Sequence, residues 1–134
     1  SACQSAKSIK GRLILEKRDK GTIAYLRGLA GEQRVAQHYA SQGYAIIEER
    51  WRGARCEIDL IFRRGTELVF VEVKVAKSHE IALHRYRADQ AARQIEAAHE
   101  YLGKDEAYAG LDIRFDLATV NEMGRIEVLE NVLI

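Results

Sequence analysis

Residues 56–75 have the sequence Cys-Glu-Ile-Asp-Leu-Ile-Phe-Arg-Arg-Gly-Thr-Glu-Leu-Val-Phe-Val-Glu-Val-Lys-Val. Two runs rich in β-branched and aromatic residues flank the pair Gly65-Thr66. A glycine and one further residue between two such runs are typical of a tight hairpin turn, because glycine readily adopts a positive φ. The pattern therefore predicts two antiparallel strands joined at this pair.

A two-residue loop also predicts which residues of the two strands face each other. Arg64 would lie opposite Glu67, so the residue numbers of every facing pair would add up to 131. A face of the hairpin that carries only apolar side chains is expected to pack on a core. On that face the expected pairs are Ile58 with Val73, Leu60 with Val71, and Phe62 with Val69.

The opposite face carries charges away from the turn. The same register places Asp59 opposite Glu72 and Glu57 opposite Lys74, with the Cβ atoms of each pair roughly 4.5–5.5 Å apart. Two carboxylates at that distance repel each other, and a divalent cation between them would turn the repulsion into attraction. Mg²⁺ often takes one or two carboxylates together with a substrate phosphate. One interpretation is therefore a metal site formed by Asp59 and Glu72, with Lys74 beside it.

The other interpretation of these charges is an ordinary solvated face. A Glu57–Lys74 ion pair on such a face would contribute at most about 1 kcal/mol. A shift of the register by one residue would also place Asp59 and Glu72 on different faces. The residue pattern by itself leaves the two interpretations level.

Length and composition indicate a soluble globular protein. The 134 residues are 47% hydrophobic and 31% charged, and no apolar run approaches the ~20 residues of a membrane span. Cys3 and Cys56 are too few for a disulfide framework or a zinc site. We expect a cytoplasmic protein with no membrane contact and no small organic cofactor.

The two halves of the chain carry opposite charge. Residues 1–55 hold 11 Lys/Arg and 5 Asp/Glu, whereas residues 56–134 hold 10 and 15. A basic half beside an acidic site is compatible with a phosphate-backbone partner. We expect residues 1–20 to form a flexible basic tail and residues 21–134 to form a single domain.

The order of predicted elements defines the fold class. Apolar residues at helical spacing predict helices over residues 22–42 and 85–102, and alternation predicts strands over 44–51, 111–120 and 125–129. Helices interleaved with strands predict an α/β fold, with a mixed sheet of about five strands flanked by helices. Gly28 and Gly31 are costly inside a helix, so they predict close approach of another segment or a later helix start.

Several arginines surround the single tryptophan. Arg50, Arg52 and Arg55 lie around Trp51, and an aromatic ring among guanidinium groups can stack on bases while the guanidinium groups hold phosphates. A strand end with a half-buried Trp51 explains the same residues equally well. Asp116 is similarly open to two interpretations, a site residue or a charge at a strand end.

A longer series of residues resembles a known family. Asp59 followed by Glu72-Val73-Lys74 resembles the D…E-x-K signature of restriction-endonuclease-like nucleases. Over residues 25–130 the chain is similar to the YraN-like family of small bacterial proteins, usually described as uncharacterised and endonuclease-like. The further matching residues are Gly28-x-x-Gly31-Glu32, Gly43-Tyr44, Arg52, Glu57-Ile-Asp-Leu-Ile61, Leu68-Val-Phe-Val-Glu-Val-Lys74, Ala98-x-x-Tyr101-Leu102 and Arg114-Phe-Asp116.

The resemblance implies a restriction-endonuclease-like core related to the archaeal Holliday-junction resolvases. In that pattern Asp59, Glu72 and the Val73 carbonyl would bind Mg²⁺ or Mn²⁺, and Lys74 would orient the attacking water or stabilise charge on the phosphate. Glu32 matches the position of an extra acid in the resolvases. Gln94 is a weaker candidate for a helix residue that some relatives place near the lysine.

The chain departs from the family pattern at two positions near these residues. Cys56 replaces the glycine that usually precedes Glu57, and Ala76 replaces a basic residue, with Lys77 next to it. Neither change removes a metal ligand, but both bear on DNA contacts in this loop.

The resulting functional expectation is a metal-dependent nuclease acting on DNA, with branched DNA as one candidate substrate and a homodimer as its matching assembly. The alternatives are a nucleic-acid-binding protein with little or no catalysis and a protein-interaction module. An acid pair that repels itself favours the nuclease, because a pure binding module has no need of it.

Overall fold

The computed structural model describes residues 9–132, with side chains described from residue 20 onward. Helices and strands alternate in the order that the sequence predicts. The elements are α1 (Ile9–Ser41), β1 (Ala45–Arg52), β2 (Glu57–Arg64), β3 (Glu67–Val75), α2 (His79–His84), α3 (Ala88–Leu102), the 3₁₀ helix η2 (Glu106–Gly110), β4 (Asp112–Val120) and β5 (Ile126–Leu129).

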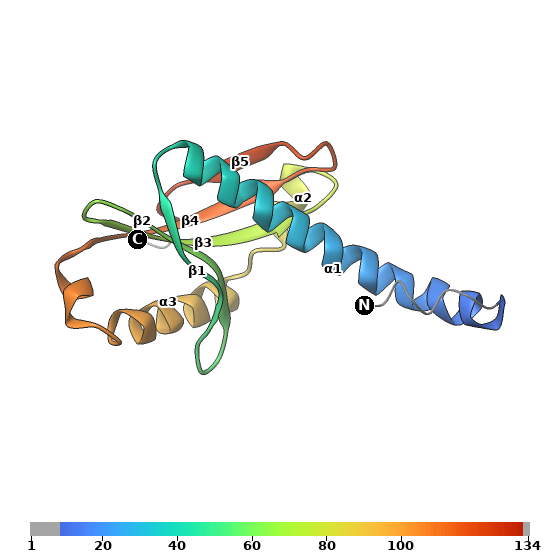
Figure 1. Cartoon of the computed structure of the whole chain (residues 1–134), viewed down its shortest axis with the longest axis horizontal. Helices are drawn as coiled ribbons and strands as arrows, with labels where there is room; N and C mark the ends of the chain where they lie inside the picture. The colour runs from blue at the N-terminus through green and yellow to red at the C-terminus, as the bar shows by residue number, and fades with distance from the viewer. Residues whose placement is uncertain (1–8, 133–134) are drawn as a thin grey trace.

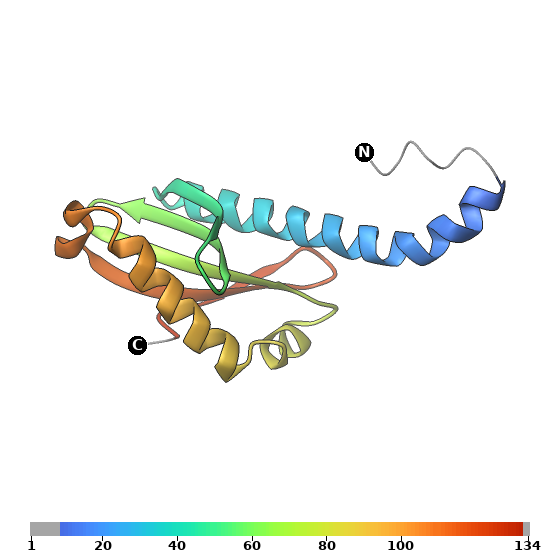
Figure 2. The ribbon, with the colours of Figure 1, turned by 90° about the horizontal axis from the view of Figure 1, so that it is seen from below.

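The five strands form one mixed sheet in the order β1-β2-β3-β4-β5. Neighbouring strands are antiparallel except β3 and β4, which are parallel and are connected through α2 and α3. Helix α1 covers one face of the sheet and α3 covers the other (Figures 1 and 2). The predicted α/β class and mixed sheet with flanking helices are therefore confirmed.

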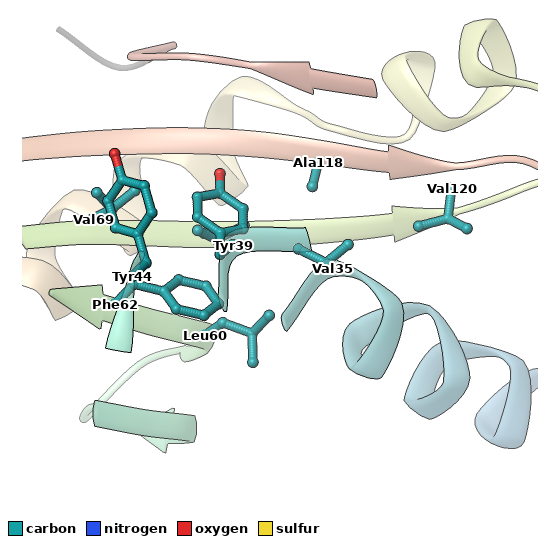
Figure 3. Packing of buried hydrophobic residues seen from close by; sticks show 9 residues of the cluster. Val35, Tyr39, Tyr44, Leu60, Phe62, Val69, Ala118 and Val120 are labelled. Carbon is teal, nitrogen blue, oxygen red and sulfur yellow. The ribbon is translucent and has the colours of Figure 1, made fainter. Parts of the chain in front are cut away.

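The core between α1 and the sheet is built from the alternating side chains of the hairpin (Figure 3). Tyr39 of α1 stacks on Phe62 of β2, with ring centroids 4.4 Å apart. Gly31 allows α1 to approach the sheet, because a Cβ there would lie 2.4 Å from Val75 Cγ2. The close approach predicted at Gly31 is thus present, whereas a Cβ at Gly28 would meet nothing within 4 Å.

The second core lies between the sheet and α3. Phe70 stacks on Phe115 of the neighbouring strand, and Tyr101 of α3 meets Phe70 edge to face. The other buried members of this core are Ile58, Ile61, Leu68, Ala97 and Ala98.

The hairpin register is as predicted near the turn and differs from the prediction further away. Gly65 has a φ of 58°, and the pairs run from Arg64–Glu67 to Leu60–Val71. The regular pairing of β2 with β3 ends there. The predicted pair Ile58–Val73 is wrong, because Val73 packs in the core beneath α1 and Ile58 in the core beneath α3. Asp59–Glu72 and Glu57–Lys74 are not part of the regular register, although the Asp59 and Glu72 carboxyls still meet. Ile58 correspondingly packs in the core beneath α3 rather than beside Leu60 and Phe62.

The strands separate at Asp59 for a reason visible in the backbone hydrogen bonds. The Asp59 carboxylate accepts a hydrogen bond from the Val73 N–H at 2.8 Å, and the side chain thereby satisfies a donor that regular pairing leaves to a backbone carbonyl. On the neighbouring strand β1, Arg50 has a φ of 46°, between residues that pair with Leu60 and Ile58. Positive φ at a residue other than glycine marks an irregular strand.

Helix boundaries also differ from the predictions. Helix α1 begins at Ile9 rather than near residue 22, so the expected tail is helical from that residue onward, and residues 1–8 lie outside the described residues. The segment is rich in leucine, lysine and arginine and the chain has no proline, so nothing in it stops a helix. Residues 76–84, which lie between the predicted hairpin and the second predicted helix, contain α2, and Ser78 caps α2 by accepting a hydrogen bond from the Ile81 N–H. No helix within residues 9–132 combines the length and apolar character needed to cross a membrane.

A buried acid cluster between the hairpin and two helices

The acidic residues predicted from the hairpin do come together. Glu72 and Lys74 lie two residues apart on β3, so their side chains leave the same face of the strand. Glu72 is 5% exposed, and its Oε2 lies 3.2 Å from Lys74 Nζ. The same oxygen accepts a 2.6 Å hydrogen bond from Gln90 Nε2 on α3.

Asp59 is the most perturbed acid of the cluster. Burial, and next the negative charge of Glu72 and a hydrogen bond with that carboxyl, raise the pKa of Asp59 to about 9. The Val73 N–H and Lys74 act in the opposite direction but do not cancel the rise. At neutral pH without a metal ion, Asp59 and Glu72 therefore share a proton.

Glu32 reaches the same cluster from α1. Burial raises the pKa of Glu32, and the nearby charges of Asp59 and Glu57 raise it further. Arg50 opposes this rise through a 3.0 Å contact between its Nη1 and Glu32 Oε1. The extra acid implied by the family pattern therefore lies close enough to Asp59 for the charge of Asp59 to affect its pKa, with its side chain 16% exposed.

The glutamine on α3 that meets the acids is Gln90 rather than Gln94. Gln94 is 1% exposed, and its Oε1 accepts a 2.6 Å hydrogen bond from the Tyr86 hydroxyl. A direct contact of Gln94 with nucleic acid would require the loss of this buried bond. Gln90 lies one helical turn earlier on the same side of the helix, and helical spacing makes it the natural second candidate.

The structure pairs each predicted arginine with an acid. Arg50 contacts Glu32, Arg52 lies 3.9 Å from Glu57, and Arg55 lies 3.1 Å from Glu96. Their side chains are 43%, 79% and 64% exposed respectively, so a phosphate can still reach the guanidinium groups. Lys77, which follows β3, is also exposed.

Trp51 and Asp116, whose roles the sequence left open, both pack or pair with other residues of the fold. Trp51 is half-buried and meets Tyr101 edge to face at 5.2 Å, which agrees with the structural interpretation of this residue. Asp116 is fully buried on β4, where it accepts from the Tyr39 hydroxyl, from Arg114 Nε and Nη2, and from the Asn131 N–H. Asp116 therefore belongs to a buried ion-pair network and not to the acid cluster.

The cluster has the donor chemistry of a hard-cation site with few protein ligands. Asp59 and Glu72 offer carboxylate oxygens in a buried place where one of them otherwise holds a proton. Over the part of the chain that the structure describes, no group of three or more His, Cys, Asp or Glu side chains converges as a metal cage. Asp59 and Glu72 could thus supply two carboxylates to a hard cation such as Mg²⁺, which takes its other ligands from water and substrate.

Comparison with known proteins identifies the family. The model of the uncharacterised protein family UPF0102 matches residues 31–120, a span that includes Glu32, Asp59, Glu72 and Lys74. A UPF0102 protein of Dinoroseobacter shibae is 43% identical over 120 residues, which cover 90% of each chain.

Two further relatives show similar coverage. A UPF0102 protein of Cereibacter sphaeroides is 40% identical over 83% of this chain and 95% of its own. One from Ruegeria pomeroyi is 41% identical over 84% of this chain and 91% of its own. The YraN-like resemblance of the hairpin residues is thereby confirmed, and the chain belongs to the uncharacterised protein family UPF0102.

Proposed function

We propose that this protein is a metal-dependent nuclease that hydrolyses DNA phosphodiester bonds. The observation that supports this most directly is the close carboxylate pair of half-buried Asp59 and buried Glu72, with Lys74 Nζ 3.2 Å from Glu72. Burying two mutually repelling acids is unfavourable for folding. The arrangement is understandable if a cation replaces the shared proton during function.

Each group of the cluster has a role in phosphodiester hydrolysis. Asp59, Glu72 and the Val73 carbonyl would hold Mg²⁺ or Mn²⁺, which when bound lowers the pKa of water and polarises the phosphate. Water attacks phosphorus as the bond to the leaving oxygen breaks, and the Lys74 ammonium stabilises the charge that develops on the phosphate oxygens. Gln90 positions Glu72 through the 2.6 Å hydrogen bond.

Glu32 is placed to support Asp59 in this proposal. Its raised pKa makes it a candidate for proton transfer, and its pairing with Arg50 keeps it at the edge of the cluster. Arg50, Arg52, Arg55 and Lys77 would contact phosphates on either side of the scissile bond. A branched DNA with two-fold symmetry would need two such sites, and we propose a homodimer for that substrate.

A binding protein without catalysis is the second candidate. It is favoured by the arginine pairing, since Arg50, Arg52 and Arg55 are each engaged by a glutamate in the free protein. Under this alternative the acid cluster would only shape the surface. The third candidate is a protein-interaction module. It gives no functional role to Lys74 beside Glu72.

Cleavage of labelled linear, flap and four-way-junction DNAs with Mg²⁺ or Mn²⁺ tests the proposal. We expect the native chain to cut at least one of them, and Asp59→Asn and Lys74→Ala to lose cutting while remaining folded. Asp112→Asn is the matched control, because Asp112 is an exposed acid at the start of β4. Binding without cutting by the folded native chain would favour the second candidate, and neither binding nor cutting would favour the third.

A further inference from the structure

The N-terminal part of α1 projects beyond the sheet as an isolated helix (Figure 2). We call residues 9–28 the arm. Its described side chains find little to pack against, since Ile23, Tyr25 and Leu26 are 46%, 65% and 52% exposed. Gly31 is the first fully buried residue along the described part of α1, and it lies against Val75 of β3. An isolated helix gains no stability from packing, so a partner that covers the arm would account for its length.

The arm leaves the domain at the acid cluster. Gly31 meets Val75, the residue after Lys74, and Glu32 lies beside Asp59. The arm ends only three residues before Gly31 along the same continuous helix. Any polymer bound across Asp59 and Glu72 would therefore pass close to the base of the arm.

The charge of the arm indicates the kind of partner. Residues 9–28 contain six Lys or Arg residues and two acids, a net charge of +4. Lys20 and Arg27 are both exposed. Two copies of the arm packed together would bring like charges into contact, whereas a phosphate backbone would neutralise them.

The length of the arm suits a duplex. Its 20 residues span roughly 30 Å as an α-helix. One turn of duplex DNA measures about 34–36 Å along its axis. A helix of this length can follow nearly one turn of the backbone on one side of the cluster.

We infer that the arm is a nucleic-acid-binding element that holds duplex phosphates next to the acid cluster. This inference rests on the proposed nuclease function for its substrate class, but it concerns binding and not cleavage. Lys20 and Arg27 are the described residues that would contact the backbone. The exposed Ile23 and Leu26 would face the sugars or the groove.

The test is binding of a fluorescent 30-base-pair duplex by anisotropy in EDTA, with salt varied from 50 to 200 mM. We expect Lys20→Gln/Arg27→Gln to weaken binding about tenfold at low salt and to flatten the salt slope by about 1.8, as two lost phosphate contacts predict. The matched control, Arg63→Gln/Lys104→Gln, also removes two positive charges. Those residues lie near the β2–β3 turn and after α3, at the end of the sheet opposite the arm (Figure 1).

The control is expected to retain the native affinity and salt slope. Equal losses in both double variants would overturn the inference, because net charge and not the arm would then explain binding. Native affinity in both double variants would also overturn the inference about the arm, but it would leave the proposed nuclease function standing. No binding by the folded native chain would count against the arm and the proposed function together.

Sedimentation of Ile23→Ser/Leu26→Ser separates the arm from a dimer surface. We expect this variant to keep the native oligomeric state, because the arm's partner is the nucleic acid. A native dimer that dissociates in this variant, together with unchanged binding in Lys20→Gln/Arg27→Gln, would assign the arm to a second copy of the chain and overturn the inference.

Discussion

Asp116 is fully buried on β4 and Asp59 is half-buried on β2 of the same sheet, and their surroundings are opposite. Asp116 is surrounded by donors, including the Arg114 guanidinium and the Tyr39 hydroxyl, which satisfy its charge. Asp59 receives one backbone N–H and shares its place with Glu72. The arrangement around Asp116 stabilises the fold. Around Asp59, within the described residues, only Lys74 and a proton compensate the negative charge of the two acids. A buried acid with too few donors is the better pointer to a functional site.

Removing each aspartate should have opposite effects on stability. Asp116→Ala leaves the buried Tyr39 hydroxyl and the Arg114 guanidinium without their acceptor, so we expect a loss of about 3 kcal/mol in the free energy of unfolding. Asp59→Asn replaces a carboxyl that must hold a proton beside Glu72 with a neutral amide, so it should leave stability unchanged or raise it at neutral pH. Urea denaturation measures both, with Asp112→Ala as an exposed control within about 0.5 kcal/mol of the native protein. A mild Asp116→Ala would show that the network is dispensable.

A divalent cation should stabilise only the acid cluster. At about one hundred times its dissociation constant, a bound ion raises the free energy of unfolding by about 2.7 kcal/mol. We therefore expect Mn²⁺ to raise the melting temperature of the native protein but not of Asp59→Asn or Glu72→Gln. Thermal denaturation with and without Mn²⁺ checks this. An equal rise in the three proteins would place the bound ion elsewhere.

The metal-free protein should lose stability as the pH rises. The folded pKa of Asp59 is about 9, whereas an unfolded aspartate titrates at roughly 4. Between these values the folded protein holds a proton that the unfolded chain has released, so stability falls as pH increases. From pH 7 to pH 9 we expect a loss on the order of 2 kcal/mol, since each pKa unit corresponds to about 1.4 kcal/mol.

Urea denaturation at both pH values in EDTA measures this loss. Asp59→Asn serves as the comparison, because its amide does not titrate, and its stability should change much less over the same interval. If the variant followed the native protein, another group would be responsible for the pH dependence.

Gln90 should have the smallest effect of the four changes. Gln90→Ala removes the 2.6 Å hydrogen bond that positions Glu72, and lost support of a ligand typically weakens metal affinity by about tenfold. Calorimetric titration with Mn²⁺ measures the affinity. Gln33→Ala provides an exposed glutamine on α1 as the control. Unchanged affinity in Gln90→Ala would mean that Lys74 and packing hold Glu72 without it.

Alternation along the chain was sufficient to predict much of this molecule. It indicated the five-stranded sheet, the turn at Gly65 and the pairing from Arg64–Glu67 to Leu60–Val71. The family resemblance placed Glu32 near Asp59. These features depend on the period of side chains and on short-range turn geometry, which are local properties of the sequence.

Features that depend on how elements sit against one another could not be predicted in the same way. Gln90 and Gln94 lie one helical turn apart on α3. The position of α3 on the sheet decides that Gln90, and not Gln94, contacts Glu72. The end of the hairpin pairing follows from a side chain, Asp59, that takes a backbone donor.

The sequence by itself determined the α/β class, the hairpin and the acids that meet near it, because each follows from residue type and spacing. Only the tertiary structure decided that Asp116 is satisfied and Asp59 is not, and that the arginines are paired in the free protein. Those distinctions arise from donors on remote segments, such as Tyr39 and Asn131 around Asp116. A carboxylate's environment depends on which distant groups the fold brings to it, and no local pattern records that.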